Sequence, residues 1–261
     1  MSGHAAQHAR AARRAPGRHL LRRRFVAELV ADADVRAGEL VVDLGAGTGH
    51  ITAALRRAGA RVLAVELDAA FAGALRRRFR DDAQVSVVEG DAREVALPEA
   101  AYRVVANLPF AGSGAILDRL LDPHGALERA DLVVEWGLAR KRAETWPATS
   151  RGIVAAAFFE VWIERRLTAA CFEPRPSVEA AVLVVRRRER PRLPLTQADA
   201  FARFVRAGFA GPTLRAGLQG RVGARRLRRL ADELAFARDA APRALDGRQW
   251  VSLFEESGRG A

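Results

Sequence analysis

The sequence is short of cysteine and of long apolar runs. It has one cysteine, one methionine, one tyrosine and one lysine in 261 residues. Cys171 alone can neither close a disulfide within the chain nor hold zinc, so we expect a reducing cytoplasm and no metal site. No stretch approaches the roughly 18 consecutive apolar residues of a membrane-spanning helix, so no membrane is expected as a partner. The N-terminal segment also lacks the apolar run of a secretory signal, although its arginines leave a transit peptide as an alternative.

Positive charge is concentrated at the two ends of the chain. Residues 1–27 carry seven arginines and no acid, and residues 186–261 carry 17 arginines and eight acids, within a net charge of +12. GC-rich coding would explain arginine in place of lysine, but not this segregation. A polyanion held by both ends explains it, which favours a nucleic-acid partner. The candidate phosphate contacts are Arg13, Arg14, Arg225, Arg226, Arg228 and Arg229. For the last four, a solvated helix face is the alternative.

Short apolar strands alternate with helical patterns in the first two thirds of the chain. The expected strands are residues 40–43, 61–66, 85–89, 102–106 and 132–135. This alternation is typical of a doubly wound, mostly parallel α/β sheet that is covered on both faces. Residues 162–167 and 180–185 follow without a helix between them, which predicts an antiparallel pair at one sheet edge.

Composition also divides the chain into parts. Residues 186–194 are charged and punctuated by proline, as in a linker, and the periodicity from Thr196 onward is helical. We therefore expect a basic N-terminal arm over residues 1–16, an α/β domain over residues 17–187, and a small all-α, nucleic-acid-binding domain over residues 193–261.

A glycine cluster follows the first strand, with the pattern Asp43-x-Gly45-x-Gly47-x-Gly49. Glycines in a strand-to-helix turn let the backbone approach a ligand closely. The spacing differs from the Gly-x-Gly-x-x-Gly of dinucleotide binders. A pyrophosphate disfavours an acid beside the glycines, whereas the ammonium and sulfonium of S-adenosylmethionine tolerate one. The pattern predicts an S-adenosylmethionine site, with NAD as the alternative.

Two further acids end the second and third strands. Glu66 lies where an acid accepts hydrogen bonds from both ribose hydroxyls of a bound nucleoside, and Asp91 could accept one from the adenine amino group. Each acid taken singly could instead cap a helix or a turn. Because the carboxyl ends of parallel strands share one edge of the sheet, we expect Asp43, Glu66 and Asp91 to surround one crevice.

The tetrapeptide Asn107-Leu108-Pro109-Phe110 follows the fourth strand directly. Such a segment can be a simple turn, but here it lies beside the expected methyl donor. The Asn107 side-chain oxygen and the Leu108 carbonyl could accept from the N–H groups of an aromatic amine such as adenine N6. Pro109 stiffens the backbone that presents the carbonyl, and Phe110 offers a face for a flipped-out base. These four residues are the predicted catalytic site.

Together these motifs resemble those of the ribosomal RNA adenine N6-methyltransferases. The similarity rests on residues 43–52, Glu66, residues 90–92 and residues 107–110, and it covers roughly residues 16–230. Residues 172–178 match the family's Phe-x-Pro-x-Pro-x-Val loop near the target base, and residues 214–218 resemble a motif of its C-terminal domain. The family comprises antibiotic-resistance enzymes of 23S rRNA and housekeeping dimethyltransferases of 16S rRNA.

The resemblance implies further site residues. His19, Leu20, Leu67 and Ala92 would join the cofactor site, and Arg18, Phe172 and Arg175 would contact RNA. The capping segment departs from the family's Gly-Gln-Asn/His-Phe-Leu, because it reads Gly17-Arg18-His19-Leu20-Leu21. His19 keeps a family residue type, with simple packing or capping as its alternative role.

The resemblance also implies a substrate. The arginine-rich arm and short C-terminal domain look more like the enzymes that confer resistance to macrolides, lincosamides and streptogramin B. We therefore expect a cytoplasmic, monomeric enzyme that methylates 23S rRNA, free or in a pre-assembly particle. A 16S rRNA dimethyltransferase and a catalytically silent nucleic-acid-binding factor of the same fold are the alternatives, and residues 107–110 argue against the second.

Overall fold

The computed structural model describes residues 19–143 and 149–258. Its contacts form two compact units. The first comprises the chain up to Leu120, Gly125–Arg140 and Trp162–Arg186, and the second comprises Leu121–His124, Lys141–Val161 and Arg187–Ala261. Each unit is described by itself below. In the described part of the chain, no helix has the length and apolar character needed to cross a membrane.

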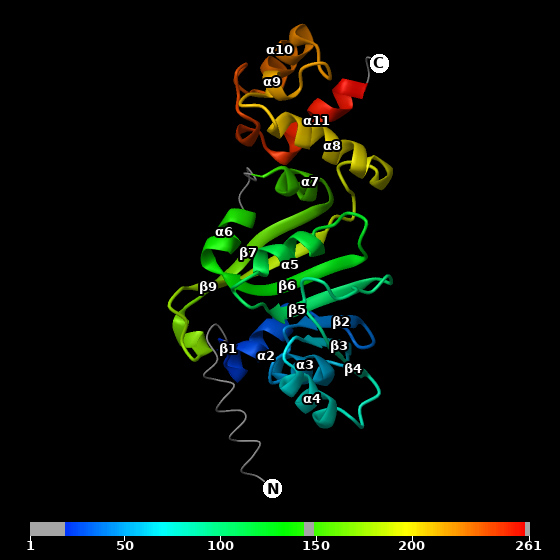
Figure 1. The fold of residues 1–261 in the computed structure, drawn as a ribbon, viewed down its shortest axis with the longest axis vertical. Helices are drawn as coiled ribbons and strands as arrows, with labels where there is room; N and C mark the ends of the chain where they lie inside the picture. The colour runs from blue at the N-terminus through cyan, green and yellow to red at the C-terminus, as the bar shows by residue number, and fades with distance from the viewer. Residues whose placement is uncertain (1–18, 144–148, 259–261) are drawn as a thin grey trace. The chain divides into compact units, whose positions relative to one another are not determined.

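The first unit is built on a seven-stranded sheet (Figure 1). The strands are β2 (Leu40–Leu44), β3 (Arg61–Glu66), β4 (Val85–Glu89), β5 (Tyr102–Asn107), β6 (Leu127–Glu135), β7 (Phe159–Leu167) and β9 (Ala180–Arg187). Their order is β4-β3-β2-β5-β6-β9-β7, with β4 to β6 parallel and β9 antiparallel to β6. The predicted α/β sheet with an antiparallel edge is confirmed, and β9 lies one place inside the edge strand β7.

The central strands are mostly apolar because both of their faces are buried. Val41, Val42, Val104 and Val105 have no exposed surface. One face packs against α2 (Arg23–Asp32) and α3 (His50–Arg57), which share a core cluster with β2, β3, β5, β6 and β9. The remaining helices of this unit are α4 (Ala69–Arg78), α5 (Ser113–Leu120) and α6 (Trp136–Ala143). The last of these continues past Arg140 into the second unit.

A second, two-stranded sheet was not expected from the sequence. It pairs β1 (Leu20–Leu21) with β8 (Phe172–Glu173), antiparallel, with Leu20 opposite Glu173 and Leu21 opposite Phe172. His19 adds a hydrogen bond from its ring Nδ1 to the Pro174 carbonyl, 3.0 Å long. These contacts hold the N-terminal segment against a loop some 150 residues later in the chain.

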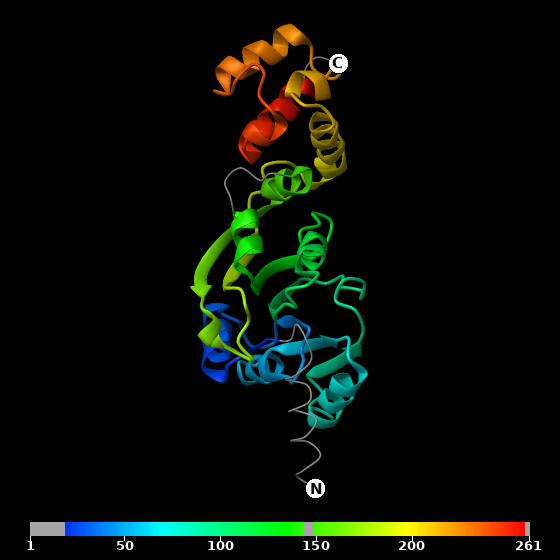
Figure 2. The ribbon, with the colours of Figure 1, turned by 60° about the vertical axis from the view of Figure 1, so that its left-hand side comes forward.

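The second unit is helical and has an aromatic core. Its helices are α7 (Ser150–Phe158), α8 (Ala198–Phe209), α9 (Leu214–Gly217), α10 (Ala224–Glu233) and α11 (Gly247–Gly258), the last four drawn in yellow to red in Figure 2. Trp250 of α11 is fully buried and meets Phe204 of α8 edge-on, with ring centroids 6.1 Å apart. Helix α7 belongs to this unit although it precedes residue 187 in the chain. The division into domains at residues 17–187 and 193–261 stays a prediction.

Candidate active site

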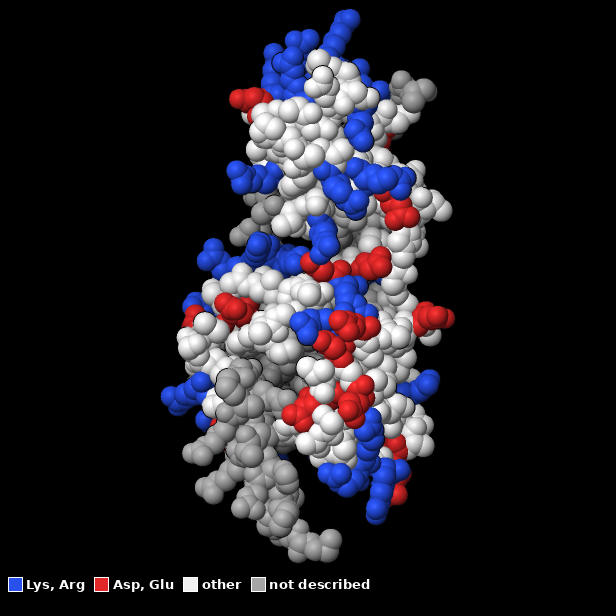
Figure 3. Space-filling model, viewed as in Figure 1, with Lys and Arg blue, Asp and Glu red and all other residues white. Residues whose placement is uncertain are grey.

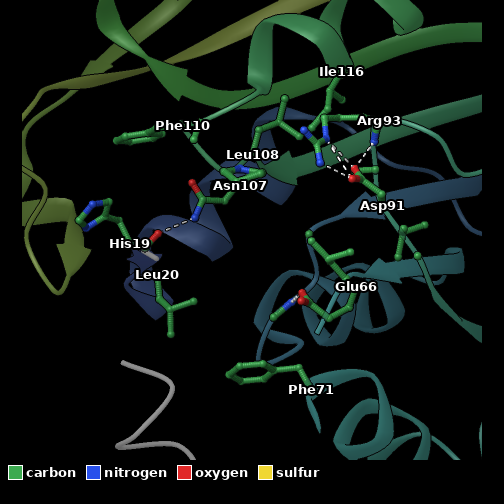
Figure 4. Close-up of a pocket in the computed structure, with 18 residues that line it drawn as sticks. His19, Leu20, Glu66, Phe71, Asp91, Arg93, Asn107, Leu108, Phe110 and Ile116 are labelled. Carbon is green, nitrogen blue, oxygen red and sulfur yellow. Dashed lines mark hydrogen bonds and ion pairs between the residues drawn. The ribbon is translucent and has the colours of Figure 1, made fainter. Parts of the chain in front are cut away.

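A cavity of about 420 Å³ lies at the carboxyl ends of β2 to β5 in the first unit (Figure 4). Predicted residues from five separate segments line it: His19, Leu20, Gly45, Gly47, Glu66, Leu67, Asp91, Ala92, Asn107, Leu108, Pro109 and Phe110. Parallel strands bring four of these segments to one edge of the sheet, as the sequence predicted, and the fifth, His19 and Leu20, comes from the separate β1–β8 sheet. Only Asp43 and Gly49, among the described cofactor candidates, are not in the wall.

The glycine loop wraps closely around the end of β3. The amide groups of Gly45 and Ala46 both donate to the Val65 carbonyl, at 2.9 and 3.0 Å. Gly45, Gly47 and Gly49 have φ values of +77°, +53° and +74°, a region in which glycine alone is unstrained. A Cβ on Gly49 would also lie 2.5 Å from Leu75. Gly49 therefore shapes the turn into α3 from behind the cavity wall.

Glu66 is held in place by the backbone around it. Its Oε2 accepts from the Gly47 amide at 2.8 Å and its Oε1 from the Asp68 amide at 2.9 Å. A carboxylate oxygen has two lone pairs and can accept two hydrogen bonds. This arrangement fits a pair of neighbouring ribose hydroxyls, and Figure 4 shows the carboxylate beside the glycine loop, with Phe71 nearby.

Asp43 is completely buried behind the loop. Its Oδ2 accepts a 2.6 Å hydrogen bond from the Thr52 hydroxyl, and its Oδ1 has no partner among the described residues. Burial raises the pKa of this carboxyl to about 7, and the nearby Glu66 adds to the rise. Because Asp43 does not line the cavity, its contact with the cofactor stays a prediction, and its visible role is to anchor α3 through Thr52.

Asp91 is paired with an arginine that the sequence reading did not include. The Arg93 guanidinium holds both oxygens of Asp91 at 2.5–3.0 Å, and the Arg93 amide donates to Oδ1 at 2.8 Å. These hydrogen bonds lower the pKa of Asp91 to about 2, so the carboxylate stays ionised at neutral pH. Both residues line the cavity, so Arg93 shares the predicted adenine end of the site.

The most informative group is the Asn107 side chain. Its Nδ2 donates to the His19 carbonyl at 2.7 Å, which leaves its Oδ1 as an acceptor. That oxygen is buried and has no hydrogen-bond partner among the described residues. In Figure 4 it points toward Phe110, away from His19. The next residue is fixed as well, because the Leu108 amide donates to the Val133 carbonyl at 3.0 Å.

Phe110 lies in a small aromatic cluster beside this oxygen. Its ring centroid is 5.6 Å from that of His19, tilted by 36°, and 6.2 Å from that of Phe172, which it meets edge-on. Phe172 is fully buried, so its side chain has no surface to offer RNA in this structure and instead supports Phe110. The buried acceptor and the half-buried ring together suit a planar base that carries an amino group.

The predicted RNA-binding arginines fall into three groups. Arg13, Arg14 and Arg18 lie outside the described residues. Arg175 is exposed in the loop after β8. The α10 arginines differ in their ion-pair partners. Figure 3 shows that basic side chains gather over this helix.

On α10, ion pairs separate two arginines from the other two. Arg226 pairs with Glu256 at 3.3 Å, and Arg229 pairs with Glu233 at 3.3 Å and with Glu256 at 3.7 Å. Arg225 and Arg228 are exposed and have no acidic partner in the described part of the chain. They are the α10 arginines best placed to meet phosphates.

Six residues of the cavity wall were not among the predicted site residues: Val65, Phe71, Gly90, Arg93, Ala111 and Ile116. Phe71 and Ile116 look like core positions in their helices, and nothing in their spacing marks them as ligand contacts. Arg93 had a weak signal, since it stands two residues after a predicted ligand. Arginine is common throughout the chain, so a single one at this position did not stand out.

The sheet order, the glycine loop, the acid at the end of β3 and the Asn-Leu-Pro-Phe segment after β5 define an S-adenosylmethionine-dependent methyltransferase. The cavity fits the cofactor, because its wall supplies a pinned carboxylate for the ribose and a free acceptor beside the donor site.

Comparison with known proteins gives the family. The model of the ribosomal RNA adenine dimethylase family matches residues 11–256. An rRNA methyltransferase from Streptomyces thermotolerans is 34% identical over 91% of this chain and 80% of its own length. The mycinamicin-resistance protein MyrB from Micromonospora griseorubida is 33% identical over 91% of this chain and 78% of its own length. The crystal structure of the 23S rRNA methyltransferase ErmE superposes with a TM-score of 0.80 at 25% identity, covering 92% of this chain and 99% of that one.

The chain therefore belongs to the ribosomal RNA adenine dimethylase family. It is an rRNA adenine N6-methyltransferase that uses S-adenosylmethionine, as the sequence predicted.

Proposed function

We propose that this enzyme methylates N6 of one specific adenine in 23S rRNA and thereby confers resistance to macrolide, lincosamide and streptogramin B antibiotics. The observation that carries the chemistry is the buried Asn107 oxygen beside Phe110, which has no hydrogen-bond partner among the described residues. The choice of 23S rRNA is supported by the similarity to ErmE over nearly the whole chain, and the resistance role by the similarity to MyrB.

The cavity residues prepare the amine for attack. The N6 lone pair of adenine is delocalised into the ring, so the amine is a poor nucleophile. The Asn107 Oδ1 and the Leu108 carbonyl accept from its two N–H groups, which aligns the nitrogen and favours its pyramidal form. Phe110 stacks on the flipped base and fixes its plane. S-adenosylmethionine supplies an electrophilic methyl group on sulfur. The N–C bond would form as the methyl group's bond to sulfur breaks, and the nitrogen, then positively charged and acidic, can lose its proton to water, so no strong base is needed.

The cofactor is held by the opposite part of the cavity. Glu66 accepts from the ribose hydroxyls, Asp91 lies where the adenine amino group of the cofactor would reach it, and the glycine loop lets the backbone approach closely. His19 and Leu20 cover this site from β1. All of these residues come from one chain, which supports a monomer, and the proposed substrate places the enzyme in the cytoplasm.

The test is methyl transfer from labelled S-adenosylmethionine to purified 23S and 16S rRNA in separate reactions, with the modified nucleotide mapped by mass spectrometry. We expect N6-methylated adenine at one position of 23S rRNA. Cells that express the enzyme should survive a macrolide, and cells that express Asn107→Ala should not. Label in 16S rRNA alone would identify a housekeeping dimethyltransferase, and no label in either RNA would identify a binding factor.

A further inference from the structure

A second cavity, of about 370 Å³, lies entirely within the second unit. It has no residue in common with the methyl-transfer cavity. Its lining includes three small residues of α7, namely Gly152, Ala155 and Ala156. Small residues on a helix leave room for a ligand of a few heavy atoms against the helix surface.

Four arginines line this cavity: Arg142, Arg188, Arg192 and Arg248. Arg188 is fixed in the wall, because it donates from Nη1 to Glu160 at 2.9 Å and from Nε to the Ala156 carbonyl at 3.2 Å. The lining therefore brings together, in one cavity, cations from α6, from the segment after β9 and from the start of α11.

Among the described residues of the wall, Asp246 is the one acid. Asp246 caps α11, since its Oδ1 accepts from the amides of Arg248 and Gln249, both at 2.8 Å. Arg192 lies against the same helix start, because a Cβ on Gly247 would be 3.1 Å from its Nη1. A helix N-terminus carries partial positive charge, which adds to that of the arginines.

This arrangement is electrostatically costly without an anion. Burial lowers the pKa of Arg192, and the like charges of Arg188 and Arg248 lower it further, against the opposing effect of Asp246 and Glu160. Arg188 and Arg192 are half-buried and Arg248 is exposed, so an anion held among them would offset their mutual repulsion. Arginine forks match the tetrahedral oxygens of a phosphate in geometry as well as in charge.

We propose that this cavity binds one phosphate group of the RNA backbone, as a docking point separate from the site of methylation. The proposal rests on the proposed function, since it takes RNA as the substrate. The phosphate would sit over Ala156 and accept hydrogen bonds from Arg192 and Arg248, with Arg188 behind it. Docking here would position the substrate without reading its sequence.

The first experiment uses inorganic phosphate as the probe. The melting temperature of the full chain is measured against phosphate concentration at constant ionic strength. We expect it to rise for the wild type, and the rise to vanish in Arg192→Gln/Arg248→Gln. Without phosphate, this double variant should melt no lower than the wild type, because two mutually repelling charges are gone. The charge-matched control Arg221→Gln/Arg243→Gln, with both sites exposed and outside the cavity, should keep the phosphate response.

The second experiment uses a 23S rRNA fragment and distinguishes RNA from free phosphate as the ligand. The double variant should lower the log–log salt slope of RNA binding by about 0.7–0.9, the contribution of one phosphate contact. Phosphate should compete with RNA for the wild type only, and cofactor affinity should be unchanged. The proposal is overturned if the double variant retains the phosphate response. It is also overturned if the double variant binds RNA with an unchanged salt slope, because the cavity would then bind free anions and not RNA.

Methyl transfer by the wild type, measured in the same preparation, separates the two failures. If the wild type does not methylate RNA, the proposed function fails. If it methylates RNA and the double variant binds that RNA with the wild-type slope, only the docking site fails.

Discussion

At the scale of single residues, the site depends on which way one amide faces. The hydrogen bond from Asn107 Nδ2 to the His19 carbonyl decides that the oxygen, and not the nitrogen, is presented to the substrate. An oxygen accepts from an amino group, whereas a nitrogen would repel it. In the mechanism proposed above, His19 would act on catalysis indirectly, by orienting a residue 88 positions away.

We predict that Asn107→Ala lowers turnover about 100-fold or more, because the reacting amine loses its alignment. Cofactor affinity, measured by calorimetry, should stay within about threefold, since the effect is confined to the transition state. His19→Ala is the matched control. It removes the ring but keeps the backbone carbonyl, so at saturating cofactor its turnover should fall far less. If Asn107→Ala abolished cofactor binding with normal single-turnover methylation, the residue would belong to the cofactor site.

A second residue-scale prediction concerns Asp43, whose pKa is about 7 in the folded chain and 3.8 as its ordinary value. The folded state therefore binds more protons than the unfolded state between about pH 4 and 7, so this group makes the wild type less stable as pH rises through that window. Asp43→Asn removes the titration and still accepts from Thr52.

The melting temperature of Asp43→Asn minus that of the wild type should therefore grow from pH 5 to pH 8 and then level off. Between pH 5 and pH 8, the difference in unfolding free energy between the two proteins should change by on the order of 2 kcal/mol. Both proteins are measured without cofactor, and the other titrating groups cancel in the difference. A difference that stays constant with pH would mean that burial does not perturb this carboxyl.

At the scale of elements, the sequence was most informative where periodicity is strong. The central strands agree with prediction within one residue, because their apolar runs are buried on both faces. Strand β6 was predicted from Leu132 but begins at Leu127. Its first half contains Arg129 and Asp131, which are paired at 2.7 Å, and the buried Asp131 does not look like a core residue in the sequence.

The site was predictable for a related reason. Residues that end parallel strands meet at one edge whatever the loops do, so Glu66, Asp91 and Asn107 could be placed together. The pairing of β1 with β8 could not, since two strands of two residues each carry no periodicity. The hydrogen bond from Asn107 to the His19 carbonyl depends on that pairing, so the sequence could not predict it.

The contact between α8 and α9 gives an element-scale prediction. The two backbones touch: a Cβ on Gly217 would lie 2.2 Å from the Gly208 carbonyl oxygen and 2.7 Å from that of Ala207. Gly217→Ala should therefore cost about 1–3 kcal/mol of stability, as overpacking does. Gly223→Ala is the control, because nothing lies within 4 Å of its Cβ and its φ is −64°. Urea denaturation should show a lower midpoint for the first variant and a change within about 0.5 kcal/mol for the second. Equal midpoints would mean that α9 moves aside at no cost.

At the scale of the whole molecule, charge and chemistry are separated along the chain. The net charge of +12 comes from the two ends, whereas the catalytic residues lie in the mildly acidic middle. Phosphate contacts supply affinity without sequence information, and base contacts supply specificity. If the ends bind phosphates as proposed, the enzyme would hold any RNA through them and methylate only the adenine that enters the cavity.

The last prediction tests this division on one helix with two variants of equal charge. Arg225→Gln/Arg228→Gln removes exposed arginines without acidic partners among the described residues, and Arg226→Gln/Arg229→Gln removes those paired with Glu233 and Glu256. The first should lower the log–log salt slope of RNA binding by about 1.4–1.8, for two lost phosphate contacts. The second should change the slope less, because its charges are already neutralised. It should also cost at most about 1 kcal/mol of stability, the usual value of exposed ion pairs. Since both variants change the net charge by the same amount, a difference in slope reports contacts and not charge. Equal slopes would show that α10 acts only through the general field of the protein, or is a solvated helix face with no contact to RNA.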